Sequence, residues 1–254
     1  MSQSIWTRCA GSSEVGRLAL DAWRVVESQV ALSTRKLVDS DAEQELLEEL
    51  LERVKPPVPR ERSFRHLHFL LYTPFRHPPL RQGSRFGTRA ERGIWYGSRA
   101  LPTALAEVAY YRLLFLEGTA ATLGTVTVEL SAFQAKIRTT HGVDLTVPPF
   151  AAHRARIASR TSYAVSQQLG HEMRAAGVEA FLFTSARDSN HGQNIGLLAP
   201  AFARRTPTIP HGWTCSATPT QVEFARKDVF RRERYAFERS AFVVGGSLPA
   251  PALR

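Results

Sequence analysis

The order in which strand-like and helix-like patterns follow one another constrains the fold of this 254-residue chain most. Residues 123–130 (LGTVTVEL) alternate polar and apolar side chains, as a strand with one buried face does. Short apolar runs predict further strands at residues 66–75, 178–185, 195–200, 213–218 and 234–244. Helical patterns separate them only at residues 103–117 and 160–177, the second ending at Gly177. Because strands and helices do not alternate regularly, an α+β fold is expected.

The N-terminal part of the chain has a different pattern. Apolar residues recur at helical spacing across residues 14–54, and "SDAE" at residues 40–43 is typical of a capping box, so two amphipathic helices are expected. Pro56, Pro57 and Pro59 then disfavour helix and indicate an extended connector. The expected organisation is an N-terminal helical region with a proline-rich connector (1–62), followed by the main domain (63–254).

The chain is strongly basic, with a formal net charge of +10 and a pI near 10.3. A positive surface favours anionic partners, but the charge alone does not choose between phosphates, nucleic acids and acidic proteins. Its two cysteines lie far apart in sequence, and no signal peptide or long apolar span is present. A cytoplasmic protein without membrane contact is therefore expected.

Several common site motifs do not fit. "HEMRA" begins at His171, but the second histidine of a zinc-protease helix would fall at Ala175. The glycines of "QGSRFG" form neither a dinucleotide-binding turn nor a P-loop, and no G-x-S-x-G motif surrounds Ser185. No metal site is expected from the sequence.

A lone carboxylate, Glu107, interrupts the apolar run "TALAEVAYYRLLFLE". A buried carboxylate carries a desolvation cost of several kcal/mol unless it is paired or lines a cleft. One interpretation is a structural ion pair with Arg112 or an upstream arginine. The other is catalytic, because a fixed carboxylate stabilises positive charge that develops on a sugar during cleavage of a glycosidic bond.

Four segments favour the catalytic interpretation by resemblance: "GSRFG" (83–87), "WYGS" (95–98), "TALAEV" (103–108) and "FTSARDSNHGQNIGLLAP" (183–200). Together they resemble the RES domain family, which includes bacterial toxins that destroy NAD⁺. The resemblance implies an α+β domain with a mixed or antiparallel sheet core similar to ADP-ribosyltransferase toxins. It also implies catalytic roles for Arg85, Tyr96, Glu107 and Ser185. The serine loop is long, so Ser189 remains a rival to Ser185.

The resemblance further implies the reaction and the substrate contacts. NAD⁺ would be the substrate, its nicotinamide–ribose bond would be cleaved, and water or inorganic phosphate would be the acceptor, with no prosthetic group. Arg85 and an upstream arginine, Arg76, are expected to bind the pyrophosphate, because a guanidinium can hold two of its oxygens at once. Tyr96 and Asn194 are expected to contact the substrate as well.

Alternatives remain open at this point. A transferase that passes ADP-ribose to a protein would break the same bond with the same residues. A basic nucleic-acid-binding protein without enzymatic activity is a further candidate, although no recognition helix, zinc finger or RNA-binding strand motif is present, and direct nucleic-acid contact is not expected. The resemblance also implies a helix-turn-helix antitoxin of the Xre type as a protein partner, and a homo-oligomer is a possible assembly.

Overall fold

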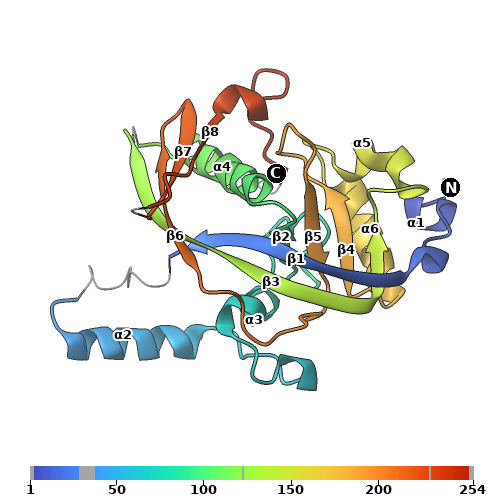
Figure 1. Ribbon diagram of the computed structural model, residues 1–254, viewed down its shortest axis with the longest axis horizontal. Helices are drawn as coiled ribbons and strands as arrows, with labels where there is room; N and C mark the ends of the chain where they lie inside the picture. Colours follow the sequence, from blue (N-terminus) through green and yellow to red (C-terminus); the bar gives the residue numbers. More distant parts are fainter. Residues whose placement is uncertain (1–2, 29–37, 122, 229, 252–254) are drawn as a thin grey trace.

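The computed structural model describes residues 3–28, 38–121, 123–228 and 230–251, and its fold is α+β (Figure 1). Within these residues an eight-stranded mixed sheet has the order β1-β2-β5-β4-β3-β6-β7-β8. The strands are β1 (Gly16–Glu27), β2 (Trp95–Ser98), β3 (Val126–Asp144), β4 (Ala180–Thr184), β5 (Gln193–Leu197), β6 (His211–Ala217), β7 (Gln221–Arg226) and β8 (Arg234–Glu238). All neighbours pair antiparallel except β3 and β4, which are parallel.

Strand β1 pairs on both of its edges. It meets β2 at Trp23↔Ser98 and follows β3 from Gly16↔Gly142 to Glu27↔Leu130. Because β3 also pairs with β4, the strands β1, β2, β5, β4 and β3 form a closed ring, and β6, β7 and β8 extend from β3. The long pair of β1 and β3 crosses the whole molecule in Figure 1.

The prediction of the first N-terminal helix is wrong, because residues 16–27 form strand β1. The segment contains both periodicities: its apolar residues match helical spacing, but Arg17, Ala19 and Asp21 also alternate with more buried neighbours, as in a strand. The segment forms a strand because it pairs with β3 along its whole length. Residues 29–37, where the expected helix continues, lie outside the described residues.

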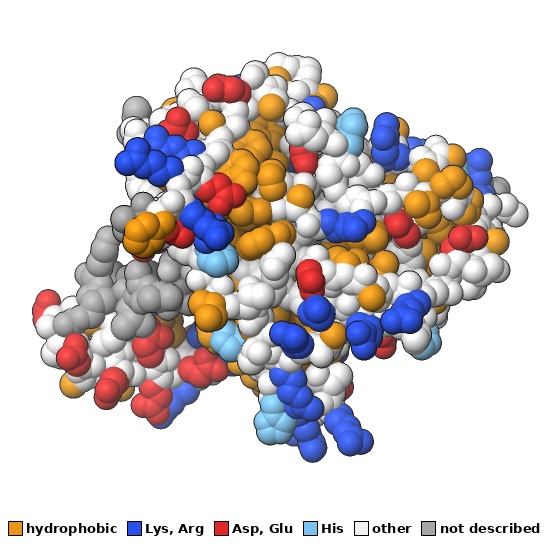
Figure 2. Space-filling model, viewed as in Figure 1, with side chains coloured by type: hydrophobic (Ala, Val, Ile, Leu, Met, Phe, Trp, Pro, Cys, Tyr) orange, Lys and Arg blue, Asp and Glu red, His pale blue; other side chains and the backbone are white. Residues whose placement is uncertain are grey.

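The second expected N-terminal helix is confirmed as α2 (Asp41–Val54). The Ser40 side chain accepts a hydrogen bond from the Glu43 backbone N–H, and the Glu43 carboxylate accepts one from the Asp39 N–H. This helix lies outside the sheet, and Figure 2 shows its acidic side chains gathered on one side of the molecule. The sheet contains β1, which precedes residue 62 in the chain, as well as the seven strands that follow it.

The prediction of a strand at residues 66–75 is also wrong, because the chain forms helix α3 there (Phe69–Arg76). Short apolar runs do not distinguish a strand from a buried helical turn. The His68 side chain accepts a hydrogen bond from the Leu70 N–H and starts the helix, which buries Leu71 and Phe75.

The other predicted strands are confirmed as β3, β4, β5, β6 and β8, although residues 239–242 form a 3₁₀ turn rather than more strand. Strand β7 was not predicted. The two predicted helices are α4 (Leu101–Glu117) and α6 (Ala164–Ala175). Gly177 has a φ of +73°, and the N–H of Val178 donates to the Met173 carbonyl, as in a Schellman cap after α6.

Helix α4 is the element that positions the candidate site. It buries Leu105, Ala109 and Leu113 in a core shared with Trp213 of β6 and Phe224 of β7. Its remaining contacts include β1, β2 and β5. On the other side of the molecule, α6 packs with the short helices α1 (Ile5–Arg8) and α5 (Arg154–Ile157). No helix in the described ranges combines the length and the apolar character needed to cross a membrane.

Candidate active site

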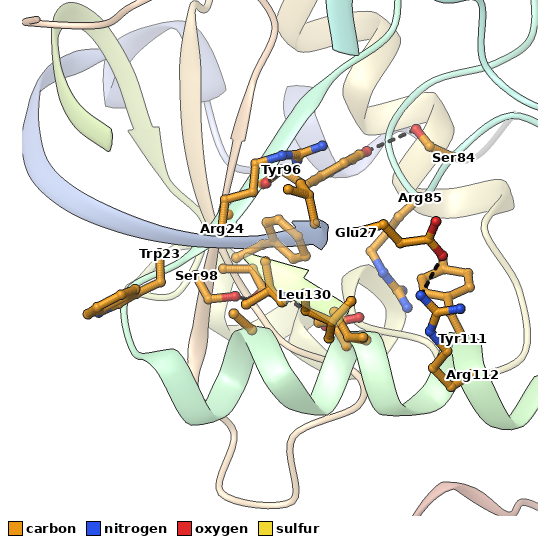
Figure 3. Close-up of a pocket in the computed structure, with 18 of the residues that line it drawn as sticks. Trp23, Arg24, Glu27, Ser84, Arg85, Tyr96, Ser98, Tyr111, Arg112 and Leu130 are labelled. Carbon is orange, nitrogen blue, oxygen red and sulfur yellow. Dashed lines mark hydrogen bonds and ion pairs between the residues drawn. The ribbon is translucent and has the colours of Figure 1, made fainter. Parts of the chain in front are cut away.

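A cavity of about 540 Å³ lies between strands β1 and β2 and helix α4 (Figure 3). Strand β1 contributes its last residues, including Arg24 and Glu27, and β2 contributes Tyr96 and Ser98. Helix α4 presents one face to the cavity, consisting of Ala104, Glu107, Val108, Tyr111, Arg112 and Phe115. Five predicted site residues are brought around this space: Arg85, Tyr96, Glu107 and Asn194 line it, and Ser185 contacts Glu107.

Glu107 is held by two neutral donors rather than by an ion pair. The Ser185 hydroxyl and the Asn194 amide each donate a hydrogen bond of 2.7 Å to Oε1 of Glu107. Within the described residues no group donates to Oε2, and no cation lies within ion-pair distance of the carboxylate. Arg112, the predicted structural partner, pairs with Glu27 at 2.6 Å instead. The second carboxylate oxygen is therefore left to interact with whatever occupies the cavity.

The orientation of Asn194 depends on Ser98. The Ser98 hydroxyl donates a hydrogen bond of 2.6 Å to Oδ1 of Asn194, so the amide nitrogen must face Glu107. Both residues are buried, and they oppose each other in the β2–β5 pair. Ser98 was not among the predicted site residues, because its role becomes visible only when β2 and β5 are paired.

Ser185 directly follows β4, and all the hydrogen-bonding capacity of its hydroxyl is in use. Its Oγ accepts hydrogen bonds from the backbone N–H groups of Arg187 and Asp188, at 3.1 and 3.0 Å, and donates to Glu107. It is thus both a turn serine and a ligand of the carboxylate. Ser189 lies exposed in the following turn.

The Tyr96 ring lines the cavity and its hydroxyl is anchored away from solvent. The hydroxyl lies 2.9 Å from the Ser84 Oγ and accepts a hydrogen bond from the Phe86 N–H. Burial raises the pKa of the Tyr96 phenol to about 12, so the side chain is neutral at physiological pH. Ser84 and Phe86 belong to the segment that carries Arg85, and Tyr96 therefore fixes that segment against β2.

Two arginines at the cavity have no carboxylate partner among the described residues. Arg85 is 8% exposed, donates to the Ser159 carbonyl at 2.7 Å, and has its guanidinium carbon 4.8 Å from the Tyr163 ring centroid. Arg24 donates to the Tyr96 carbonyl at 2.5 Å, while its Nε is buried without a hydrogen bond. Burial lowers the pKa of Arg24 to about 10. Two such guanidiniums beside one cavity make a site suited to an anionic ligand.

Arg24 was missed because its segment was interpreted as helix. In strand β1 it sits opposite Phe133 of β3 and next to the β2 edge, which carries it to the cavity. Its sequence surroundings, "AWRVV", contain two β-branched valines, which is the signal that favours a strand there.

The structure does not bring Arg76 to the other residues. Arg76 ends helix α3 and lies outside the cavity lining. Its Nη2 pairs with Oε1 of Glu52 in α2 at 2.7 Å, and its Nε donates to the Pro56 carbonyl. It connects α2 and the proline-rich connector to α3.

The RES domain family matches residues 58–216 of this chain. The chain belongs to the RES domain family. The matched range contains Arg85, Tyr96, Glu107, Ser185 and Asn194. It begins at residue 58 and therefore does not include Arg24. Strand β1 and helix α2 thus lie outside the part of the RES domain that the family match covers, although β1 helps to form the cavity.

A crystal structure of the M. tuberculosis MbcT–MbcA toxin–antitoxin complex is similar to this RES domain chain at 10% sequence identity. The similarity covers 86% of this chain and 94% of that chain, with a TM-score of 0.46. No curated protein matches the sequence. In the described ranges, no group of three or more histidine, cysteine or acidic side chains is arranged to hold a metal ion.

Proposed function

We propose that this RES domain protein cleaves the nicotinamide–ribose bond of NAD⁺. The observation that carries the proposal is the state of Glu107, whose Oε1 is held by Ser185 and Asn194 while Oε2 is left for a ligand. Departure of nicotinamide leaves positive charge on the ribose, shared between C1 and the ring oxygen. A carboxylate fixed beside that charge stabilises the transition state more than the neutral ribose of the substrate's ground state.

The electrons and protons balance without a prosthetic group. The bond between C1 of the ribose and the pyridinium nitrogen breaks, its electron pair goes to that nitrogen, and nicotinamide leaves as a neutral molecule. An acceptor oxygen then bonds to C1. Water gives ADP-ribose after losing a proton, and inorganic phosphate gives ADP-ribose 1″-phosphate.

Arg85 and Arg24 support the dinucleotide as substrate. A pyrophosphate supplies the negative charge that both guanidiniums lack among the described residues, and each can offer paired N–H donors to it. Tyr96 contributes its ring to the same wall and holds the Arg85 segment in place. Binding at these points would orient the nicotinamide ribose toward Glu107.

We also propose that the protein is the toxin of a toxin–antitoxin pair, located in the cytoplasm and neutralised by a helix-turn-helix antitoxin of the Xre type that covers the cavity. RES family membership supports this role. A homo-oligomer is a further proposal. Co-expression with the product of a neighbouring gene, followed by co-purification, would test the pairing.

The activity itself is tested by incubating the purified protein with NAD⁺ and separating the products by chromatography. The expected result is free nicotinamide together with ADP-ribose or its 1″-phosphate. Nicotinamide with ADP-ribose attached to protein would identify a protein ADP-ribosyltransferase instead. Unchanged NAD⁺ would overturn the proposal.

A further inference from the structure

The cavity side of α4 carries two exposed aromatic side chains beyond Glu107. Tyr111 is 49% exposed and Phe115 is 56% exposed, and both line the cavity. Large aromatic residues seldom remain this exposed without a binding role when they share a concave surface. Figure 2 shows hydrophobic side chains exposed over this helix.

Glu107, Tyr111 and Phe115 follow each other at intervals of four residues, so they form one line along the helix. With a rise of about 1.5 Å per residue, the line extends roughly 12 Å from the carboxylate to Phe115. The cavity therefore continues well beyond the position of the bond that Glu107 would help to break.

The position of Arg85 indicates where the distal half of a bound dinucleotide would lie relative to Glu107. Figure 3 places Arg85 on the same side of the cavity as Tyr111 and Arg112, with Trp23 on the opposite side. Tyr163 lies between them in this wall, because its ring centroid is 4.8 Å from the Arg85 guanidinium carbon and it lines the same cavity as Tyr111. A pyrophosphate held at Arg85 would direct its distal half toward the two aromatic rings.

We infer that Tyr111 and Phe115 form an aromatic platform that stacks the distal base of the dinucleotide, which for NAD⁺ is adenine. This inference rests on the proposed function. Stacking on an aromatic side chain suits a nucleobase because both have flat π faces, and it tolerates an exposed position. The platform explains why a dinucleotide rather than a mononucleotide would be the preferred substrate.

The test compares NAD⁺ with nicotinamide mononucleotide, which has the same scissile bond but no adenosine. Tyr111→Leu and Phe115→Leu should each lower kcat/KM for NAD⁺ about 5- to 150-fold, mainly through KM, the range expected from losing one base–aromatic stack. Turnover of the mononucleotide should fall far less. Tyr111→Phe and Phe115→Tyr keep the rings and should retain most of the kcat/KM that the leucine variants lose.

Phe230→Leu provides the matched control, because Phe230 is 95% exposed and lies outside the cavity lining. Trp23→Leu tests the opposite side of the cavity. A loss of NAD⁺ selectivity in Trp23→Leu, with both α4 variants unchanged, would overturn the inference. Thermal unfolding of every variant checks that the fold is retained.

Calorimetric binding of ADP-ribose separates this inference from the proposed function, because it requires no turnover. A protein that cleaves NAD⁺ but binds ADP-ribose equally well without the two rings has the proposed activity and no base platform. A protein that leaves NAD⁺ intact, yet binds ADP-ribose in a manner dependent on Tyr111 and Phe115, has the platform without the activity. If neither cleavage nor binding occurs, both are wrong.

Discussion

The Ser185 hydroxyl donates a 2.7 Å hydrogen bond to Oε1 of Glu107, joining the end of β4 to the middle of α4. These two residues are 78 positions apart in the chain. Since the same Oγ accepts two backbone N–H groups, its proton can point only toward the carboxylate. The turn after β4 and the carboxylate of α4 are therefore fixed as one unit.

Glu107→Gln should abolish most of the activity without unfolding the protein. Oε1 accepts both internal hydrogen bonds, so a glutamine oxygen can replace it while the amide nitrogen takes the place of Oε2. The charge that stabilises the transition state is lost, and kcat should fall by roughly 10² or more. Nicotinamide release measures this. A folded variant with nearly full activity would exclude Glu107 from catalysis, and a variant that does not fold would indicate a structural carboxylate.

Ser185→Ala should reduce turnover while Ser189→Ala should not. The alanine removes a donor from Glu107 and leaves the Arg187 and Asp188 N–H groups without their acceptor. Losing a hydrogen bond to a charged group typically costs about 1.5–3 kcal/mol, which corresponds to a roughly ten- to hundredfold lower rate. Steady-state kinetics of both variants provide the comparison. A larger effect from Ser189 would show that the exposed turn, rather than the end of β4, carries the functional serine.

Arg85→Lys and Arg24→Lys should each raise KM for NAD⁺ severalfold or more. A lysine ammonium cannot reproduce two parallel N–H donors to a pyrophosphate, and neither arginine has a carboxylate in the described residues that would hold a shorter side chain in place. Arg76→Lys is the matched control, because Arg76 pairs with Glu52 outside the cavity. Equal KM values for all three variants would assign the pyrophosphate to other residues.

The buried Tyr96 phenol should make the folded state less stable in alkali. Its pKa is raised from 10.0 to about 12, so the unfolded chain releases this proton first as the pH rises. The contribution is fully present below pH 10.0 and is lost between there and about pH 12, at up to about 1.4 kcal/mol per pH unit. Urea unfolding at several alkaline pH values measures the slope, which Tyr96→Phe should reduce. An identical slope in wild type and variant would contradict the buried, neutral phenol.

Inorganic phosphate should increase and saturate the rate if it is the acceptor. As an anion it would enter a cavity lined by Arg24, Arg85 and Arg112, and the product would be ADP-ribose 1″-phosphate. Because the only Ser185 proton is already donated to Glu107, Ser185→Ala should leave the phosphate concentration that gives half-maximal rate unchanged. A rate indifferent to phosphate, with ADP-ribose as the sole product, would assign water as the acceptor.

The residues that could be predicted from sequence are those within short local motifs. Arg85, Tyr96 and Glu107 fall in three neighbouring segments, and the structure brings them around one cavity. Their positions follow from local chain geometry, with a strand leading into a helix. The α+β class was likewise predictable, because it needs only the order of elements.

The residues that could not be predicted depend on pairing between distant strands. Arg24 reaches the cavity only because β1 inserts between β2 and β3, and Ser98 acts through Asn194 only because β2 lies against β5. The spacing of apolar residues within one segment does not reveal which distant strand that segment pairs with. The same reason explains why residues 16–27 were expected to be helical, since the partner that makes them a strand lies more than a hundred residues away.

The pairing of β1 and β2 with distant strands also determines when the site can be completed during synthesis of the chain. Arg24 leaves the ribosome before Glu107, and Glu107 before Ser185 and Asn194, while β1 must wait for β3 before its pairing can form. A nascent chain that stops before β5 lacks both the strand that pairs with β2 and the amide that positions the carboxylate. Unfinished chains would therefore lack a complete site, and the proposed activity would arise only after most of the polypeptide has been translated.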